Sequence, residues 1–369
     1  MKSSIVLGLG FGDEGKGRTV SALASLNTNN LVVRFSGGHQ AGHTVVYDNN
    51  RHIFSSFGSA TLQGVPTYWS RFCTFYPLAA LNELDKLKKA GINPMLYIDP
   101  MCPVTTPFDV KKNRDRANFD TVGVGIGTTF ERQEKFYRLY FKDLFYERVC
   151  EEKLRLIAEY YGNNAGDKAF DRFMGDVFEV THNSAFRTSI DFNDFSHLIF
   201  EGSQGIMLDE DAGFYPNVTW GNTTSKNAVL FLAELGISVD DISVYYVTRP
   251  YQTRHGRGYM SNEGVVPNLT PNEKETNVKS PYQGDFRYGI LDIDQLQYAL
   301  KCDHQFVSNN IEKNLVITCL DQITDRFLAT YEQEMLEIPV NSSSMLASYM
   351  GVPINKTLRS FADSGDVEI

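Results

Sequence analysis

The sequence has few cysteines and no long apolar run. Its five cysteines are scattered along the chain and form no C-x-x-C pair: Cys73, Cys102, Cys150, Cys302 and Cys319. This pattern favours a reduced, cytoplasmic setting over a secreted fold held by disulfides. The opening MKSSIVLGLGFGDEGKG has only a few apolar residues before glycines and charges intervene, which is typical of neither a signal peptide nor a membrane span. We therefore predict a soluble protein with no membrane partner.

Positive charge is also in deficit. The 369 residues include 35 Lys and Arg against 45 Asp and Glu, which gives a formal net charge of −10. Proteins that bind duplex nucleic acid carry a basic face, so the balance argues against a nucleic-acid partner. It does not exclude a small anionic substrate, because a local cluster of donors binds phosphate on an acidic protein. With 42% hydrophobic residues, a folded globular chain is expected.

The hydrophobic pattern indicates apolar strands that each run into a polar or glycine-rich loop. We find no internal repeat and no convincing linker, so we predict one domain over 1–369; the polar, turn-rich stretch 260–285 reads as a mobile loop. The expected strands are 4–10, 31–35, 197–205, 242–254 and 314–323, and the expected helices are 18–26, 78–90 and 131–160. Together they predict an α/β fold with a mostly parallel central sheet, crossover helices and smaller peripheral elements. Ligands of such sheets bind at the carboxyl ends of the strands.

The first glycine-rich loop fits the phosphate-binding pattern G-x-x-x-x-G-K. It runs from Gly10 to Lys16, follows a strand and opens a helix, so its backbone amides and Lys16 are expected to hold phosphates. Gly17 stands where Ser or Thr usually binds magnesium, which leaves Asp13 as the available carboxylate ligand. The same carboxylate has a second use as a proton acceptor. The loop alone leaves kinase, GTPase and ligase open.

The second glycine-rich loop, S-G-G-H-Q-A-G-H-T at 36–44, holds His39 and His43 four residues apart. No Glu, Cys or third His lies at a zinc-ligand spacing in the sequence. We therefore interpret the imidazoles as proton-donating or positively charged groups beside a phosphate.

The two loops together resemble those of the adenylosuccinate synthetase family, which carries G-D-E-G-K-G and G-G-x-N-A-G-H-T at similar spacing. Further family motifs follow in order along the chain: G-T-T at 127–129, F-E-G-S-Q-G at 200–205, T-R-H-G-R-G at 253–258, T-C-L-D at 318–321 and G-V-P at 351–353. The resemblance implies a ligase that forms a C–N bond in purine biosynthesis. A nucleoside triphosphate phosphorylates the 6-oxygen of a purine nucleoside monophosphate, and the amino group of L-aspartate then displaces that phosphate.

The resemblance also implies a role for each matching residue. Asp13 takes the N1 proton of the purine, and Lys16 neutralises phosphate charge. His43 donates a proton or a hydrogen bond to the developing oxyanion and to the phosphoryl group that is transferred. Mg²⁺ is expected on Asp13 and the carbonyl of Gly42. The triphosphate site comprises Gly12, Asp13, Glu14, Gly15, Lys16, Gly17, Gly42, His43, Thr44 and the guanine-reading Asp321. The monophosphate site comprises Asp13, Gln40, Ala41, Thr128, Thr129, Gln204 and Thr219, and the aspartate site comprises Gly284, Asp285 and Arg287.

Family members form homodimers in which a neighbouring subunit contributes an arginine to the substrate phosphate. The resemblance therefore implies a homodimer here. Arg132, Lys135 and Arg138 are open alternatives for that contribution, because the match to the family is broken in this region.

The chain departs from the family at the aspartate loop, T-T-G-R-R-R-R-T-G-W-L-D. The corresponding stretch 280–292 keeps Arg287 of the arginine run, and Asp285 stands where an arginine touches the ribose 2′-hydroxyl. Cys319 replaces the lysine that packs on the guanine of GTP, so ATP or GTP is a possible donor. These departures resemble a viral branch, the N6-succino-2-amino-2′-deoxyadenylate synthetases. They predict dGMP as the substrate, 2-aminoadenine nucleotide synthesis, and a bacteriophage protein in the host cytoplasm.

Two alternatives stay open beside this hypothesis. One is an ordinary synthetase that uses IMP, GTP and L-aspartate. The presence of Asp13 favours this alternative, because part of the viral branch has Ser at that position. The other is a nucleotide-binding protein without turnover, which would not need both Asp13 and His43.

Overall fold

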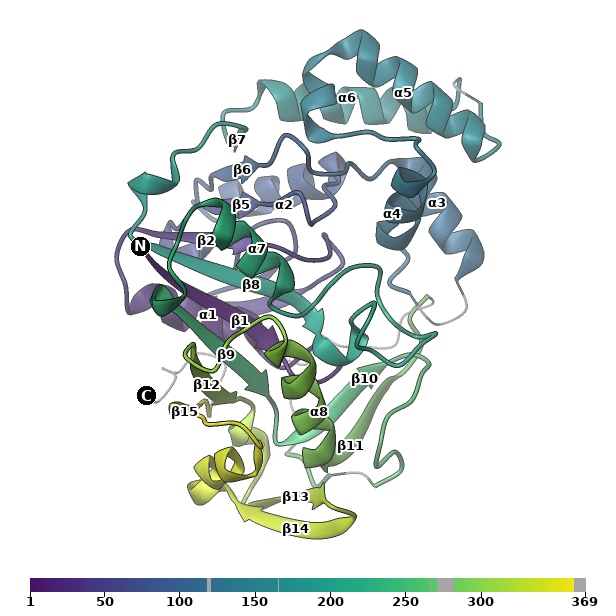
Figure 1. Cartoon of the computed structure of the whole chain (residues 1–369). Coiled ribbons are helices and arrows are strands. Elements are labelled where there is room, and N and C mark those ends of the chain that lie inside the picture. Colours follow the sequence, from purple (N-terminus) through teal and green to yellow (C-terminus); the bar gives the residue numbers. More distant parts are fainter. Residues whose placement is uncertain (118–120, 165, 266, 271–281, 362–369) are drawn as a thin grey trace.

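A computed structural model provides the structure of the chain (Figure 1). It describes residues 1–369 except 118–120, 165, 266, 271–281 and 362–369. Nine strands form one sheet in which each neighbouring pair is parallel. In spatial order they are β15 (Lys356–Arg359), β12 (Glu312–Ile317), β9 (Ile242–Thr248), β1 (Lys2–Gly8), β8 (His197–Gly205), β2 (Asn30–Arg34), β5 (Thr67–Trp69), β6 (Leu96–Ile98) and β7 (Phe186–Arg187). The predicted parallel α/β fold is confirmed.

The central strands are the apolar runs of the sequence. All five residues of β2 are buried, and β1 and β8 each have one residue that is not. Near-continuous burial is what a strand covered on both faces by helices requires. The side chains Ile5, Leu7, Val33, Phe200 and Val244 belong to one hydrophobic cluster across β1, β2, β8 and β9. The predicted strand 197–205 coincides with β8.

Eight α-helices among the described residues surround this sheet. They are α1 (Lys16–Ser25), α2 (Pro77–Lys89), α3 (Pro107–Arg116), α4 (Ile126–Glu134), α5 (Glu147–Tyr160), α6 (Lys168–His182), α7 (Lys226–Glu234) and α8 (Ile293–His304). Figure 1 shows α5 and α6 side by side beyond the β7 edge, with α3 and α4 beside them. No helix within the described part of the chain is long and apolar enough to cross a membrane.

The expected helix over 131–160 is interrupted in the structure. Helix α4 ends at Glu134, Phe136 adopts a left-handed φ of 68°, and a short 3-10 segment, Phe141–Phe145, precedes α5. Leu139 and Phe141 of the irregular connection are fully buried. The apolar side chains that suggested one long helix therefore serve the core from a loop, where tertiary packing overrides helix propensity.

The expected strand over 242–254 is in fact two strands in different sheets. Strand β9 ends at Thr248, Arg249 and Pro250 form the turn, and β10 (Tyr251–His255) joins a four-stranded sheet. Proline lacks the N–H that would continue the ladder, so the strand breaks there. The second sheet has the order β10, β11 (Phe286–Asp292), β13 (Arg326–Tyr331) and β14 (Glu334–Pro339), and β3 (His43–Tyr47) with β4 (Asn50–Phe54) forms a separate hairpin. Part of the predicted loop 260–285, namely 266 and 271–281, lies outside the described residues.

The parallel sheet brings five loops to one edge. Strands β12, β9, β1, β8 and β2 are consecutive neighbours with the same direction. Their carboxyl ends therefore lie side by side, and the segments that follow them meet although residues in contact, such as Glu14 and Thr318, are 304 positions apart in the sequence.

Candidate active site

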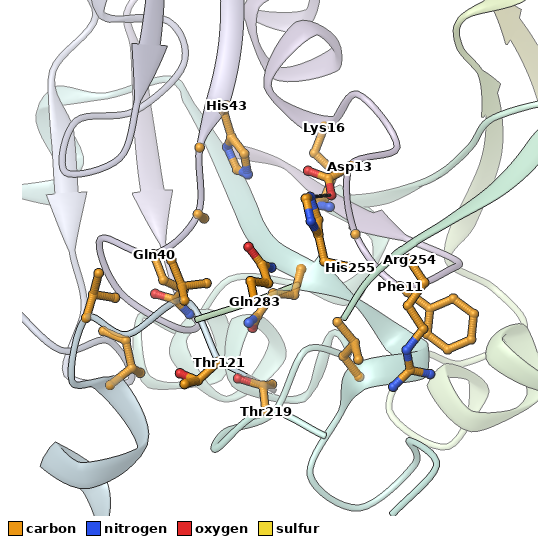
Figure 2. Close-up of a pocket in the computed structure, with 18 of the residues that line it drawn as sticks. Phe11, Asp13, Lys16, Gln40, His43, Thr121, Thr219, Arg254, His255 and Gln283 are labelled. Atoms are coloured by element: carbon orange, nitrogen blue, oxygen red, sulfur yellow. Dashed lines mark ion pairs between the residues drawn. The ribbon is translucent and has the colours of Figure 1, made fainter. Parts of the chain in front are cut away.

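A cavity of about 650 Å³ lies at the carboxyl edge of the sheet. The segments after β1, β2, β9 and β12, the end of β8, the start of α4 and the end of β10 all contribute to its lining (Figure 2). Most residues predicted for the site are brought together there: Gly12, Asp13, Gly15, Lys16, Gly17, Gln40, Ala41, Gly42, His43, Thr44, Thr128, Gln204, Thr219 and Asp321.

The cavity has the charge that the whole chain lacks. Seven cationic side chains line it, namely Lys16, Arg18, Arg51, Arg116, Arg249, Arg254 and Arg257, against the three carboxylates Asp13, Glu131 and Asp321. A cleft lined by one sign of charge concentrates ions of the opposite sign. The acidic protein therefore carries a local site suited to phosphates and carboxylates.

Asp13 occupies the centre of the phosphate-loop region. Its backbone has a left-handed φ of 63°, and Nε of Arg249 donates to its carbonyl oxygen at 2.5 Å. Nε2 of His255 lies 3.4 Å from its Oδ2. Burial raises the pKa of Asp13, while His255, Arg249 and Lys16 act in the opposite direction. A carboxyl with a raised pKa is a better proton acceptor than an ordinary aspartate.

Glu14 differs from its predicted role in the triphosphate site. Its carboxylate turns into the loop, where it accepts hydrogen bonds from the amides of Gly10 and Gly12 at 3.0 and 2.8 Å. It also pairs with Nζ of Lys16 at 2.9 Å. The side chain thus shapes the loop and orients Lys16, and Glu14 is not among the described residues that line the cavity.

His43 is held by a buried carboxylate in the middle of β8. Its Nδ1 lies 2.5 Å from Oε1 of Glu201, and Glu201 also accepts hydrogen bonds from the hydroxyl and the amide of Ser59. Burial alone raises the pKa of Glu201, but His43, Arg34 and Ser59 bring it down to about 2. The ionised carboxylate fixes the imidazole through Nδ1 and leaves Nε2 as the nitrogen available to the cavity.

Gly17, the departure from the usual phosphate loop, has a steric reason. A Cβ at this position would lie 2.7 Å from Cβ of His43 and 2.7 Å from Oγ of Ser59. The loop residue that commonly holds magnesium is therefore missing because His43 occupies that space. His39, the other histidine of the second loop, lies with its ring 5.2 Å from that of Tyr76. Burial lowers its pKa to about 4, and His39 is not among the described residues that line the cavity, so the expected contact of His39 with a phosphate stays a prediction.

Strained backbone conformations and polar atoms without a hydrogen-bond partner also occur at the cavity. Asp13, Gln204 and Cys319 line it with left-handed φ values of 63°, 58° and 55°, each of which costs about 1 kcal/mol or more for a non-glycine residue. Among the described residues, both amide atoms of Gln40 and the Oε1 atom of Gln204 are buried and lack a hydrogen-bond partner. Buried polar atoms of this kind need a partner that a bound ligand supplies.

The start of α4 forms one side of the cavity, where the family resemblance predicts the monophosphate. Ile126, Gly127 and Thr128 line it, and the first amides of a helix are free to bind an anion. The hydroxyl of Thr128 donates to the carbonyl of Asp109 at 2.8 Å. Thr129 is fully buried and its hydroxyl contacts Thr105 and the carbonyl of Gly125. The two hydroxyls thus stabilise the helix start, and within the described chain Thr129 is not part of the lining.

Arg254 and Arg287 face each other across β10 and β11. Nη2 of Arg254 donates to the carbonyl of Asn217, and its guanidinium lies 4.3 Å from the ring of Phe11. Burial and the neighbouring Arg287 lower the pKa of Arg254 to about 10. Arg287 lowers the pKa of Arg254 more than the nearby Glu263 raises it, so the two arginines still repel each other and an anionic ligand would relieve that repulsion.

The predicted aspartate-binding residues lie just outside the cavity. Arg287 contacts Oε1 of Glu263 at 2.7 Å and the carbonyl of Gly258 at 2.8 Å. Gly284 is buried and Asp285 is exposed, and neither is among the described lining residues, although Gln283 is. Gly258 is required here, because a Cβ would lie 2.2 Å from Nη2 of Arg254.

Several lining residues were not predicted as site residues. Arg254 and His255 belong to the T-R-H-G-R-G motif, and a histidine beside glycines after a strand end is the same signal that indicated His43. Arg257 belongs to the same motif, whereas the other basic residues, Arg18, Arg51, Arg116 and Arg249, carried no local pattern. Of the residues considered for contact with a neighbouring subunit, Arg132 is fully buried and paired with Asp109 at 2.8 Å, so it is excluded from that role.

The oxygen donors in the cavity fit magnesium. Asp13 and Gly42 both line it, and Mg²⁺ is typically bound by one or two carboxylates together with phosphate oxygens and water. No cluster of three or more His, Cys, Asp or Glu side chains suited to a metal occurs in the described part of the chain. The donor set therefore suits an ion shared with a phosphate ligand better than a dedicated protein cage.

The family model for adenylosuccinate synthetase matches residues 5–345. The chain belongs to the adenylosuccinate synthetase family. An adenylosuccinate synthetase of Neisseria gonorrhoeae is 32% identical in an alignment of 292 residues that covers 71% of this chain and 65% of the relative. One from Vesicomyosocius okutanii is 32% identical in an alignment of 302 residues that covers 74% of this chain and 66% of the relative. The matched region spans about two thirds of the length of these curated relatives.

Solved structures of the family share the fold at low sequence identity. A fully ligated adenylosuccinate synthetase from Plasmodium falciparum has a TM-score of 0.76 at 18% identity, covering 100% of this chain and 99% of the other. A cyanophage S-2L succinoaminodeoxyadenylate synthetase bound to dGMP and dATP has a TM-score of 0.63 at 14% identity, covering 99% and 94%. Both comparisons establish the architecture.

Proposed function

We propose that this protein is a magnesium-dependent ligase that joins L-aspartate to C6 of a purine nucleoside monophosphate with a nucleoside triphosphate as phosphoryl donor. The observation that carries the proposal is the convergence of Asp13, Lys16 and the His43–Glu201 pair on one cationic cavity. A nucleotide-binding protein without turnover has no need for a carboxylate of raised pKa beside a carboxylate-held imidazole.

The cavity residues divide the reaction between them. Asp13 accepts the N1 proton of the purine, which places negative charge on O6, and O6 then forms a bond to the γ-phosphorus as the bond to the nucleoside diphosphate breaks. Lys16 and His43 offset the phosphoryl charge in this step. The amine of aspartate next attacks C6, and inorganic phosphate leaves with the former O6. Asp13 and the carbonyl of Gly42 would hold Mg²⁺, and the bound ion would supply positive charge that neutralises the phosphates.

Each substrate has a separate wall of the cavity. We assign the monophosphate to Gln40, Gln204, Thr219 and the start of α4, and the triphosphate to the first loop with Asp321. We assign aspartate to the side where Arg254 and Arg287 lie opposite each other. Of the stretch 280–292 that corresponds to the family's aspartate loop, residues 280 and 281 fall outside the described residues.

For the purine, we favour IMP, which reverses the preference drawn from the sequence. Curated relatives at about 32% identity carry the name adenylosuccinate synthetase, whereas the likeness to the cyanophage protein is one of fold. Asp285, on which the deoxyribose argument rested, is exposed and is not among the described lining residues. The dGMP-using reaction stays a second candidate because Asp285, Phe286 and Cys319 still differ from the family pattern.

A substrate panel tests the proposal. Purified protein is given IMP, GMP, dIMP or dGMP, each with ATP or GTP, Mg²⁺ and L-aspartate, and the succinyl nucleotide is measured by its absorbance and mass. We expect turnover with IMP that exceeds turnover with dGMP. Preference for dGMP selects the second candidate, and no product with any pair rejects the ligase.

A further inference from the structure

The end of β10 brings a second histidine to the proposed proton acceptor. His255 is the last residue of this strand, and its Nε2 lies 3.4 Å from Oδ2 of Asp13 (Figure 2). The His255 ring rests against the ring of Phe286, which is its register partner on β11, with centroids 4.5 Å apart. The imidazole is therefore placed by the four-stranded sheet, while the carboxylate that it meets belongs to a loop of the nine-stranded sheet.

Asp13 is held from two sides. Its backbone, at a left-handed φ of 63°, receives a hydrogen bond from Arg249 on the carbonyl, and Oγ1 of Thr318 donates to the next carbonyl, that of Glu14, at 2.6 Å. These contacts fix the main chain. They leave the side-chain rotamer open, since the carboxylate borders a cavity and keeps 26% of its surface exposed. The His255 contact acts on the side chain itself.

A carboxylate in a roomy cavity needs such a contact to work as a base. Proton transfer requires the accepting oxygen to lie within hydrogen-bond distance of the donor, and a misplacement of about 1 Å costs up to 100-fold in rate. Oδ2 of Asp13 faces His255. In this rotamer Oδ1 is therefore the oxygen that is left to accept a proton from a ligand in the cavity.

We propose that His255 is a positioning residue that fixes the rotamer of Asp13 for proton abstraction from the purine. This inference rests on the proposed ligase function. His255 acts through Asp13, so its loss lowers kcat and leaves the KM values for both nucleotides close to those of the unaltered protein.

The chain contains a matched control. Nε2 of His52 lies 3.4 Å from Oε1 of Glu83, and the His52 side chain is 13% exposed against 12% for His255. His52 lies on β4 and is not among the described residues that line the cavity. The two pairs share their chemistry, their separation and the burial of the histidine, and they differ in the carboxylate: Asp13 is 26% exposed and lines the cavity, whereas Glu83 is 5% exposed and is not among the described lining residues.

The kinetic test compares His255→Leu, His255→Gln and His52→Leu with the unaltered protein. We expect His255→Leu to lower kcat about 10- to 100-fold with KM changed less than threefold. Gln carries a donor at the place of Nε2, so His255→Gln should recover most of the loss, and His52→Leu should stay within twofold. Equal losses in His255→Leu and His255→Gln, or a loss confined to KM, overturn the proposal.

A structural test does not depend on turnover. Crystal structures of the unaltered protein and His255→Leu are compared, after thermal unfolding has shown that both fold. We expect the Asp13 carboxylate to leave its rotamer, or to occupy several, in the variant. An unchanged, single Asp13 rotamer overturns the proposal even if the protein is active. Absence of all turnover in the unaltered protein rejects the ligase function, and this second test still decides the role of His255.

Discussion

The parallel strands of the nine-stranded sheet begin at its amino edge and end at its carboxyl edge. Each of these two edges carries a buried histidine, and the two histidines have different partners. At the amino edge, His197 opens β8 and bonds Ser4 Oγ at 2.9 Å and Asn30 Oδ1 at 3.1 Å. At the carboxyl edge, His43 bonds the ionised Glu201 of the same strand, four residues after His197. His197 has neutral partners and ties three strands together, whereas His43 has a charged partner and an open cavity. A buried histidine with neutral partners, such as His197, stabilises the fold. A buried histidine that is held by a carboxylate and borders a cavity, such as His43, can act on a ligand.

The largest expected effect lies at the carboxyl edge. Asp13→Asn keeps the shape of the side chain but removes the proton acceptor, so we expect kcat to fall about 10³-fold, with partial retention of triphosphate binding. Steady-state turnover and nucleotide titration measure the two. Asp48→Asn is the control, since Asp48 is also left-handed, with φ 46°, but is exposed in the turn between β3 and β4. A kcat within tenfold of the unaltered protein would contradict the role of Asp13.

The carboxylate that orients His43 comes next. Glu201→Gln removes the charge opposite the imidazole, and we expect kcat to fall about 100-fold. Glu83→Gln is the matched control, because Glu83 is similarly buried and accepts from Ser55 and Ser56 amides and from His52. Both variants should unfold at lower temperature, and Glu201→Gln alone should lose turnover beyond its loss of folded protein. Equal kcat values in the two would show that Glu201 serves stability.

Gly17→Ser restores the usual residue of a phosphate loop and should nevertheless be harmful. The added Cβ meets Cβ of His43 at 2.7 Å, so His43 must shift, and we expect about a 10-fold loss of kcat. The control is Gly166→Ser, where the added Cβ has open space. An increase in kcat in Gly17→Ser would indicate that magnesium binding by the added hydroxyl contributes more to turnover than the unshifted position of His43.

Arg287→Leu tests the rim formed by β10 and β11. Loss of one charged donor to a carboxylate should raise KM for L-aspartate about 10-fold and leave the nucleotide KM values unchanged. Arg326→Leu removes a comparable surface ion pair with Glu337 and should have no kinetic effect. An unchanged aspartate KM would place the aspartate site elsewhere.

The smallest effect is expected at the amino edge and concerns stability. Burial lowers the pKa of His197 to about 4 from its ordinary value of 6.5. Between these pH values the unfolded chain binds more protons at His197 than the folded chain does. The contribution of neutral His197 to the free energy of unfolding is therefore complete above about pH 6.5 and is lost as the pH falls towards 4, by up to about 1.4 kcal/mol per pH unit. Urea unfolding of His197→Asn should show a weaker dependence over this range, with kcat unchanged at pH 7. An identical pH dependence in the variant would contradict this.

The sequence predicted the carboxyl edge well because local patterns determine it. Strand β8 coincides with the predicted 197–205, and the glycine-rich loops after β1 and β2 reach the cavity as expected. The failures are matters of tertiary structure. The inward turn of Glu14 depends on amides two and four residues away, and His255 reaches Asp13 because Pro250 sends β10 into another sheet. Periodicity in one segment contains no information about either.

Isotope transfer from the purine tests the central claim most directly. Protein, IMP labelled with ¹⁸O at the 6-position, GTP, Mg²⁺ and L-aspartate are incubated, and inorganic phosphate is analysed by mass spectrometry. If Asp13 and His43 direct O6 onto the γ-phosphorus, each phosphate released with a succinyl nucleotide carries one ¹⁸O. Formation of the succinyl nucleotide with unlabelled phosphate, or release of phosphate without any succinyl product, would contradict the account.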